Sequence, residues 1–140
     1  MKLQLSQKTE YAYDGLLMLH EADAGYVPGK TIAHFLDISP EYLTKIMGPL
    51  VRSGWLISSS GTSGGYKIAI DIDDYCVLDL IEIVEGKVDR SRCMHGDTRD
   101  PALETCEMHE PWVRARDALL TELEVAPLTR SGHASPSKGE

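Results

Sequence analysis

The stretch from residue 31 to residue 66 constrains the fold more than any other part of the chain. Two short segments with helical spacing of apolar residues, at about 31–36 and 40–53, are separated by a turn at 37–39. Ser39 can cap the second helix, and Pro40 suits its first position, where a missing N–H costs nothing. Two short helices joined in this way indicate a helix-turn-helix.

Helical spacing also predicts which residues of these two helices face the core. The expected core residues are Ile32, Ala33, Phe35 and Leu36 in the first helix, and Leu43, Ile46, Met47 and Leu50 in the second. This leaves Tyr42, Thr44 and Lys45 on the other face of the second helix. Pro49 is expected to kink or loosen the end of this helix, and Gly54 to stop it.

A hairpin is expected after Gly54. Residues 55–57 and 66–70 are typical of strands, and the segment between them, 58–65, is polar and rich in glycine, as hairpin tips are. Helix, turn, helix and β-ribbon together predict a winged helix-turn-helix, which places its second helix in the major groove of DNA. The alternative is a three-helix fold that uses the same pattern for protein contacts. Of the two, we favour the DNA-binding winged helix-turn-helix.

Length and charge set limits on the whole chain. Its 140 residues suit one domain, no apolar run approaches the roughly 20 residues that span a membrane, and residues 1–10 lack a signal-peptide core. We therefore expect a cytoplasmic protein that does not bind membranes. Residues 1–70 carry six Lys/Arg and six Asp/Glu, whereas residues 71–140 carry eight and sixteen, so the net charge of −8 belongs to the second half. DNA binding would therefore depend on shape and a few base contacts.

Further helices are expected on both sides of the winged unit. A first helix should run from Ser6 or Thr9 to about Ala22, and a linker helix should cover residues 74–86, capped by Asp73 or Asp74. We thus expect a mostly α fold with a small β-wing, in a single domain over residues 1–128. Its parts are the winged helix-turn-helix (about 1–70), the linker helix (74–86), a loop (87–109) and a last helix (110–125).

The last helix has an apolar stripe formed by Trp112, Ala115, Leu119 and Leu123. A lone helix cannot bury this stripe, so we expect it to pack against a second copy and form a homodimer. Packing on its own domain is the alternative, and both can hold at once. Residues 129–140 are polar, contain no core residue and are expected to be a disordered tail.

Residues 87–109 lack any apolar period, and a segment of this length without structure is usually functional or disordered. It contains four possible metal ligands, Cys93, His95, Cys106 and His109. Thiolate and imidazole suit zinc or an iron–sulfur cluster. The alternatives are an exposed loop with incidental thiols, and a thiol switch between Cys93 and Cys106. The third cysteine, Cys76, is expected to be a small buried residue at the start of the linker helix.

The order of these pieces resembles the Rrf-type transcription regulators over about residues 1–123. The matching motifs are Met1-Lys2-Leu3, Ile38-Ser39 with Tyr42-Leu43, Gly64-Gly65-Tyr66, and Ile83-Val84-Glu85-Gly86. The resemblance implies a dimer that binds palindromic DNA. In many members the affinity for DNA changes when an iron–sulfur cluster is lost, oxidised or nitrosylated, so the expected signal is redox state, nitric oxide or iron–sulfur status.

The resemblance also implies a ligand set. The family usually has three loop cysteines; this chain matches the first with Cys93 and the last with Cys106, but lacks the middle one. Some members use a carboxylate from the first helix of the other subunit, and Glu10 stands at that position. A 2Fe–2S cluster on Cys93, Cys106, Glu10 and His109 is therefore favoured, with Asp14 as a substitute for His109 and a 4Fe–4S cluster as the alternative. Glu10 can also be an ordinary solvated helix residue.

The DNA contacts implied by the resemblance come from the second helix of the pair and from the wing. They are Ser39, Tyr42, Thr44 and Lys45, with Ser60, Gly61 and Thr62 at the tip. Family wings often begin with an arginine before the glycine, and Ser60 here removes that contact. Thr44 and Lys45 replace the Glu and Gln that read bases in a relative, so the operator should differ.

Two other functions compete with a cluster-based regulator. One is a metal-free regulator of the same type that uses a cysteine thiol switch, a small molecule or a protein partner. The other is a zinc- or thiol-dependent enzyme. The enzyme is disfavoured because the chain has no nucleophile–base pair and no phosphate-binding loop; the glycines at 61–65 lack the strand and helix of a dinucleotide motif.

Overall fold

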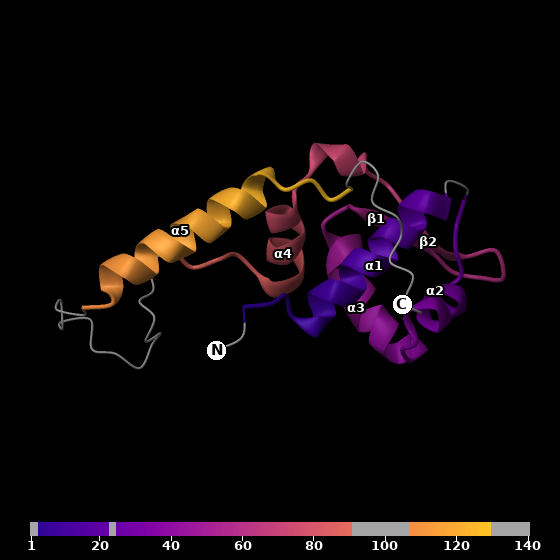
Figure 1. Cartoon of the computed structure of the whole chain (residues 1–140). Coiled ribbons are helices and arrows are strands. Elements are labelled where there is room, and N and C mark those ends of the chain that lie inside the picture. Colours follow the sequence, from indigo (N-terminus) through magenta and orange to yellow (C-terminus); the bar gives the residue numbers. More distant parts are fainter. Residues whose placement is uncertain (1–2, 23–24, 91–106, 130–140) are drawn as a thin grey trace, which may run out of the picture.

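The computed structural model of the chain, shown in Figure 1, describes residues 3–22, 25–90 and 107–129. Its first half contains helices α1 (Gln7–Ala22), α2 (Gly29–Leu36) and α3 (Pro40–Arg52), followed by strands β1 (Leu56–Ser59) and β2 (Gly65–Ile68). The second half contains the 3-10 turn η1 (Ile72–Asp74), then α4 (Val77–Glu85) and α5 (His109–Val125). The predicted fold class, mostly helical with a small antiparallel wing, is confirmed.

The core lies where α1, α2, α3 and the wing meet. Its fully buried side chains are Leu16, Ile32, Leu43, Ile46, Met47, Leu50 and Leu56. The predicted core residues of α2 and α3 are buried except Phe35, which is 50% exposed. Successive helix residues are about 100° apart, which puts Ile32, Ala33 and Leu36 on one side and Phe35 roughly 100° from its centre.

The turn between α2 and α3 forms because Asp37 adopts a left-handed conformation (φ 57°), and the N–H of Ile38 then bonds to the carbonyl of Ala33 at 3.0 Å. The hydroxyl of Ser39 accepts a hydrogen bond from the N–H of Tyr42 at 3.1 Å, as expected for a helix cap. Pro49 does not end α3, which continues to Arg52.

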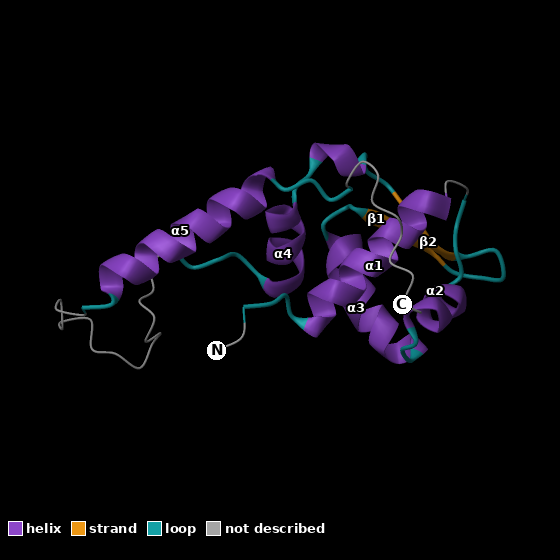
Figure 2. Cartoon of the chain, in the orientation of Figure 1, coloured by secondary structure: helices purple, strands orange, loops and turns teal. Residues whose placement is uncertain are grey.

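A third backbone segment pairs with the wing, which the sequence did not indicate. Val27, which lies just before α2, pairs with Tyr66 through backbone bonds of 2.8 and 2.9 Å. This pairing requires glycine at residue 65, because its φ is +135° and a Cβ there would lie 2.0 Å from the carbonyl oxygen of Val27. The strands lie at the end of the molecule opposite α5 (Figure 2).

The predicted caps of the linker helix, Asp73 and Asp74, are wrong. Asp71 caps η1 by accepting the N–H of Asp73 at 3.0 Å, and the cap residue of α4 is Cys76, whose N–H donates to Asp79 at 2.9 Å. The short 3-10 turn occupies residues 72–74, so the α-helix starts later, and its cap residue is half-buried, not fully buried.

The chain after α5 returns to the core. Leu128 is fully buried, and the hydroxyl of Tyr13 donates to its carbonyl at 2.5 Å. The N–H of Val77 donates to Ala126 at 2.9 Å, and Thr129 donates to Asp73 at 2.9 Å. The rest of the segment expected to be a tail, 130–140, lies outside the described residues.

Helix α5 projects away from the winged unit (Figure 1) and packs on α4. Leu120 is its buried residue. Of the predicted apolar stripe, Trp112 and Leu123 are half-buried, whereas Ala115 and Leu119 are exposed. The chain's own domain therefore covers only part of the stripe.

Candidate DNA-binding surface and metal-ligand residues

The outer face of α3 carries the predicted base-reading residues. Ser39, Thr44 and Lys45 are exposed, and Tyr42 is half-buried. The hydroxyl of Thr44 donates to the carbonyl of Pro40 at 3.1 Å, which leaves its oxygen as an acceptor. Lys45 offers a charged donor on this face.

The wing tip presents Ser60, Gly61 and Thr62, all exposed and uncharged. Gly61 has φ +97°, and its carbonyl accepts the N–H of Gly64 at 3.1 Å, which closes the turn. Such a tip can contact DNA through hydroxyl and backbone groups, but it brings no positive charge of its own.

Tyr42 also contacts α1, which sequence reasoning missed. The rings of Tyr11 and Tyr42 meet edge to face, with centroids 6.0 Å apart and planes at 89°. This is a favourable aromatic geometry, and it attaches the first turn of α3 to α1. The only signal in the sequence was an aromatic residue on each helix, which does not identify a pair.

The start of α1 is joined to the end of α4. Ser6 accepts the N–H of Thr9 at 3.1 Å, and its hydroxyl donates to the carboxylate of Glu85 at 3.0 Å. Thr9 is fully buried and donates to the same carboxylate oxygen. Residue 10 therefore follows a helix turn that is fixed to α4.

The described metal-ligand candidates are not gathered in one subunit. Glu10 is exposed on α1, Asp14 is half-buried one turn later, and His109 is the exposed first residue of α5. Figure 1 shows that the start of α5 lies at the far end of the molecule from α1. Within the described residues, no three His, Cys, Asp or Glu side chains form a metal-binding group. Cys93, His95 and Cys106 lie outside the described residues.

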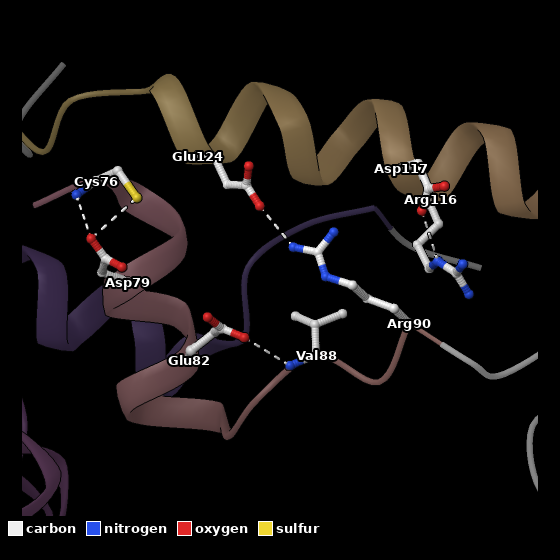
Figure 3. A network of polar contacts seen from close by, with 8 residues as sticks. All are labelled: Cys76, Asp79, Glu82, Val88, Arg90, Arg116, Asp117 and Glu124. Carbon is white, nitrogen blue, oxygen red and sulfur yellow. Dashed lines mark hydrogen bonds and ion pairs between the residues drawn. The ribbon is translucent and has the colours of Figure 1, made fainter.

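The entry to the loop is bonded to both neighbouring helices (Figure 3). The N–H of Val88 donates to Glu82 at 3.1 Å, and Arg90 forms an ion pair of 2.7 Å with Glu124 of α5. Both groups of the ion pair are about half exposed, so it contributes little to stability, but it directs residue 90 along α5.

Cys76 is the cap residue of α4 and lies outside the loop. Its Sγ lies 3.2 Å from a carboxylate oxygen of Asp79 (Figure 3), to which the thiol donates. Burial raises the pKa of the Cys76 thiol above its usual value, so this group stays protonated at neutral pH. Its bonds to Asp79 give Cys76 a local structural role as the cap of α4.

In the part of the chain that the structure describes, no helix combines the length and apolar character needed to cross a membrane.

The sequence model of the family Rrf2, described as "Iron-dependent Transcriptional regulator", matches residues 5–130. The chain is 32% identical over 112 residues to the HTH-type transcriptional regulator IscR of Photobacterium profundum, covering 79% of this chain. It spans 64% of the length of that relative.

Solved structures agree with this relationship. CymR of Bacillus subtilis, described as its global cysteine regulator, has a TM-score of 0.71 and 27% identity, covering 91% of this chain and 94% of that one. An oxidised form of CymR from Staphylococcus aureus has a TM-score of 0.67 and 26% identity, covering 90% and 93%. The fold contains a helix-turn-helix with an exposed second helix and a short wing. The family model matches residues 5–130, which is most of the chain. The chain belongs to the Rrf2 family of DNA-binding transcription regulators.

Proposed function

We propose that this protein is a cytoplasmic homodimer that binds a palindromic operator and senses redox state, nitric oxide or iron–sulfur status through a loop-bound iron–sulfur cluster. The observation that carries the DNA-binding part is the face of α3 that the core leaves exposed. Leu43 and Ile46 pack into the core and hold the helix in place, while Thr44 and Lys45 are exposed to solvent. This is the arrangement with which a recognition helix enters the major groove.

The donor types in the chain support the sensing part. Two thiolates, an imidazole and a carboxylate suit a 2Fe–2S cluster, which would supply a one-electron redox change. Glu10 and His109 are exposed, and Figure 1 shows that the start of α5 projects far from α1 within one subunit. The set Cys93, Cys106, His109 and Glu10 therefore requires Glu10 from a second copy of the chain. Asp14 replaces His109 in the second choice of ligands.

The exposed part of α5 supports the dimer. Leu119 is 51% exposed, and Ala115, exposed one turn before it, continues the same apolar surface. A second copy that packs along α5 would cover these residues and bring two α3 helices to one operator. Two-fold symmetry of the protein then matches a palindrome in the DNA.

A metal-free regulator with a thiol switch is the second candidate. It is favoured by the similarity to CymR, which has been seen in an oxidised form, and by the absence of a middle loop cysteine. Oxidation would then join Cys93 to Cys106 as a disulfide, with two electrons and two protons passed to an oxidant such as a peroxide.

Anaerobic purification followed by an absorption spectrum with iron and sulfide analysis separates the two candidates. We expect a coloured protein whose chromophore is abolished by Cys93→Ala or Cys106→Ala. Glu10→Ala and His109→Ala should keep some colour but shift the spectrum and hasten cluster loss. Cys76→Ala is the control and should leave the spectrum unchanged, because this residue caps α4 through its bonds to Asp79 and lies outside the loop.

A colourless protein that forms a Cys93–Cys106 disulfide would support the second candidate instead. If Cys76→Ala bleached the protein while Cys93→Ala did not, the loop would not be the sensor.

Lys45→Ala should weaken operator binding, because Lys45 is an exposed cation in the first half of α3. If it contacts a base, the loss should be about 1–3 kcal/mol and concentrated at one operator position. Binding to a set of single-base operator variants measures this, with the exposed Lys87→Ala as the matched control. An equal loss on every sequence would make Lys45 a phosphate contact.

A further inference from the structure

The wing contains a single charged side chain. From residue 53 to residue 70 the chain has no arginine, aspartate or glutamate, and Lys67 is the only lysine. The tip residues 60–62 are uncharged, and the protein as a whole has a net charge of −8. Any electrostatic attraction between the wing and the phosphates of DNA must therefore come from Lys67.

The strand register fixes the direction of Lys67. Its neighbours Tyr66 and Ile68 pack against the core, so alternation along β2 turns Lys67 to the outer face of the wing. There it pairs with Ile57 of β1, which is 46% exposed. Among the described residues, Lys67 takes part in no ion pair.

The outer face also places an aromatic ring under the ammonium group. The Val27–Tyr66 pairing brings Tyr26 beside β2, and Lys67 Nζ lies 5.9 Å from the centre of its ring. A cation over an aromatic face is attracted without being neutralised. Tyr26 therefore restrains the ammonium group while leaving its full charge available to an anion.

The same pairing sets Lys67 next to the start of the helix-turn-helix. Pro28 and α2 follow directly after Val27, and a Cβ on Gly29 would lie 3.7 Å from the ring of Tyr66. If α3 enters the major groove, as in other winged helix-turn-helix proteins, we expect the duplex to pass with phosphates beside the wing.

We propose that Lys67, held by Tyr26, is the phosphate contact of the wing and supplies the charge that its tip lacks. The ligand is a phosphodiester of duplex DNA. This assignment rests on the proposed DNA-binding function, to which it adds one sequence-independent contact per subunit. It also predicts that Lys45 contacts base edges and so recognises sequence, whereas Lys67 contacts phosphate and does not.

The test uses the full-length protein and two duplexes of about 30 base pairs, which hold two half-sites. One duplex is selected by the unmodified protein from a random-sequence pool, and the other is its shuffled version. Fluorescence anisotropy at salt concentrations from about 0.05 to 0.3 M gives the slope of log affinity against log salt. Melting curves establish that each variant is folded.

Lys67→Gln should reduce the steepness of this slope by about 0.9 per bound subunit on both duplexes, or about 1.8 for a dimer. At 0.15 M salt the affinity should fall about fivefold per subunit. This is the factor by which one phosphate contact, with a slope of about 0.9, changes the affinity between about 0.15 and 1 M salt. Lys67→Arg should restore both values. Tyr26→Ala keeps the charge, so it should keep the slope and lower the affinity less than Lys67→Gln does.

Lys87→Gln is the matched control, since Lys87 is exposed but follows α4 and lies outside the wing. An unchanged slope and affinity in Lys67→Gln, while the unmodified protein binds normally, would overturn the Lys67 assignment alone. A loss seen only on the selected duplex would also overturn it, because Lys67 would then read bases. If the unmodified protein bound neither duplex, both the assignment and the proposed function would be overturned.

Discussion

Leu119→Asp is expected to convert the protein into monomers and to lower its affinity for a palindromic operator by at least about a hundredfold, or about 2.7 kcal/mol. Leu119 is 51% exposed on α5, at the centre of the apolar stripe that the chain's own domain leaves partly uncovered. A carboxylate there would be buried without a partner in the dimer, which costs several kcal/mol. A monomer then contacts one half-site instead of two. Sedimentation and operator binding measure the two effects.

Thr121→Asp is the matched control for this substitution. Thr121 is exposed on the same helix, two residues and about 200° further round, so it faces away from the stripe. It should leave both the dimer and operator binding intact. A Leu119→Asp variant that remained dimeric with unchanged affinity would show that α5 is not the dimer contact.

Ile46→Ala is expected to lower the free energy of unfolding by about 2–5 kcal/mol. Ile46 is fully buried on α3, where it packs in the core with Leu43 and Leu50. The substitution removes apolar contacts and leaves a cavity under the recognition helix. A domain of this size has a total stability of about 5–15 kcal/mol, so the variant would lose a large share of it. Urea unfolding followed by circular dichroism gives the value.

Ile57→Ala removes the same atoms from a side chain that is 46% exposed on the wing. Its cost should stay below about 1 kcal/mol, because surface substitutions rarely cost more. Equal costs for the two substitutions would contradict the burial of Ile46 beneath α3.

Local chemistry explains which parts of the fold could be predicted. Ser39 and Pro40 fix the start of α3 through bonds within one turn, and helical spacing identifies Leu43 and Ile46 as core residues. The polar, glycine-rich segment 58–65 marks the wing for the same reason. Each of these features depends on residues that are close in sequence.

The features that were missed depend on residues far apart in sequence. Tyr13 bonds to Leu128, 115 positions away, and Thr9 bonds to Glu85, 76 positions away. Val27 joins the wing because its backbone meets Tyr66, which no pattern in its own segment indicates. Such contacts are decided by how the helices pack, and propensity and periodicity do not contain that information.

The candidate site divides in the same way. The exposed α3 face follows from the spacing of its buried residues, so Thr44 and Lys45 could be identified from the sequence. The proposed ligand set could not be placed from the sequence, because Glu10 and His109 belong to different helices, and the start of α5 projects far from α1 (Figure 1). In the proposed dimer, Glu10 would come from a second copy, and the patterns in the sequence do not show how two copies would pack.

The two contacts on the first turns of α1 have a mechanical consequence. Thr9 is bonded to Glu85, at the point where the chain leaves α4 for the loop, and Tyr11 rests against Tyr42 of α3. Thr9 and Tyr11 are only about 3 Å apart along a rigid helix axis. The base of the loop and the first turn of the recognition helix therefore both contact the same short segment of α1. One cannot move relative to the other without breaking either the Thr9–Glu85 hydrogen bond or the Tyr11–Tyr42 contact.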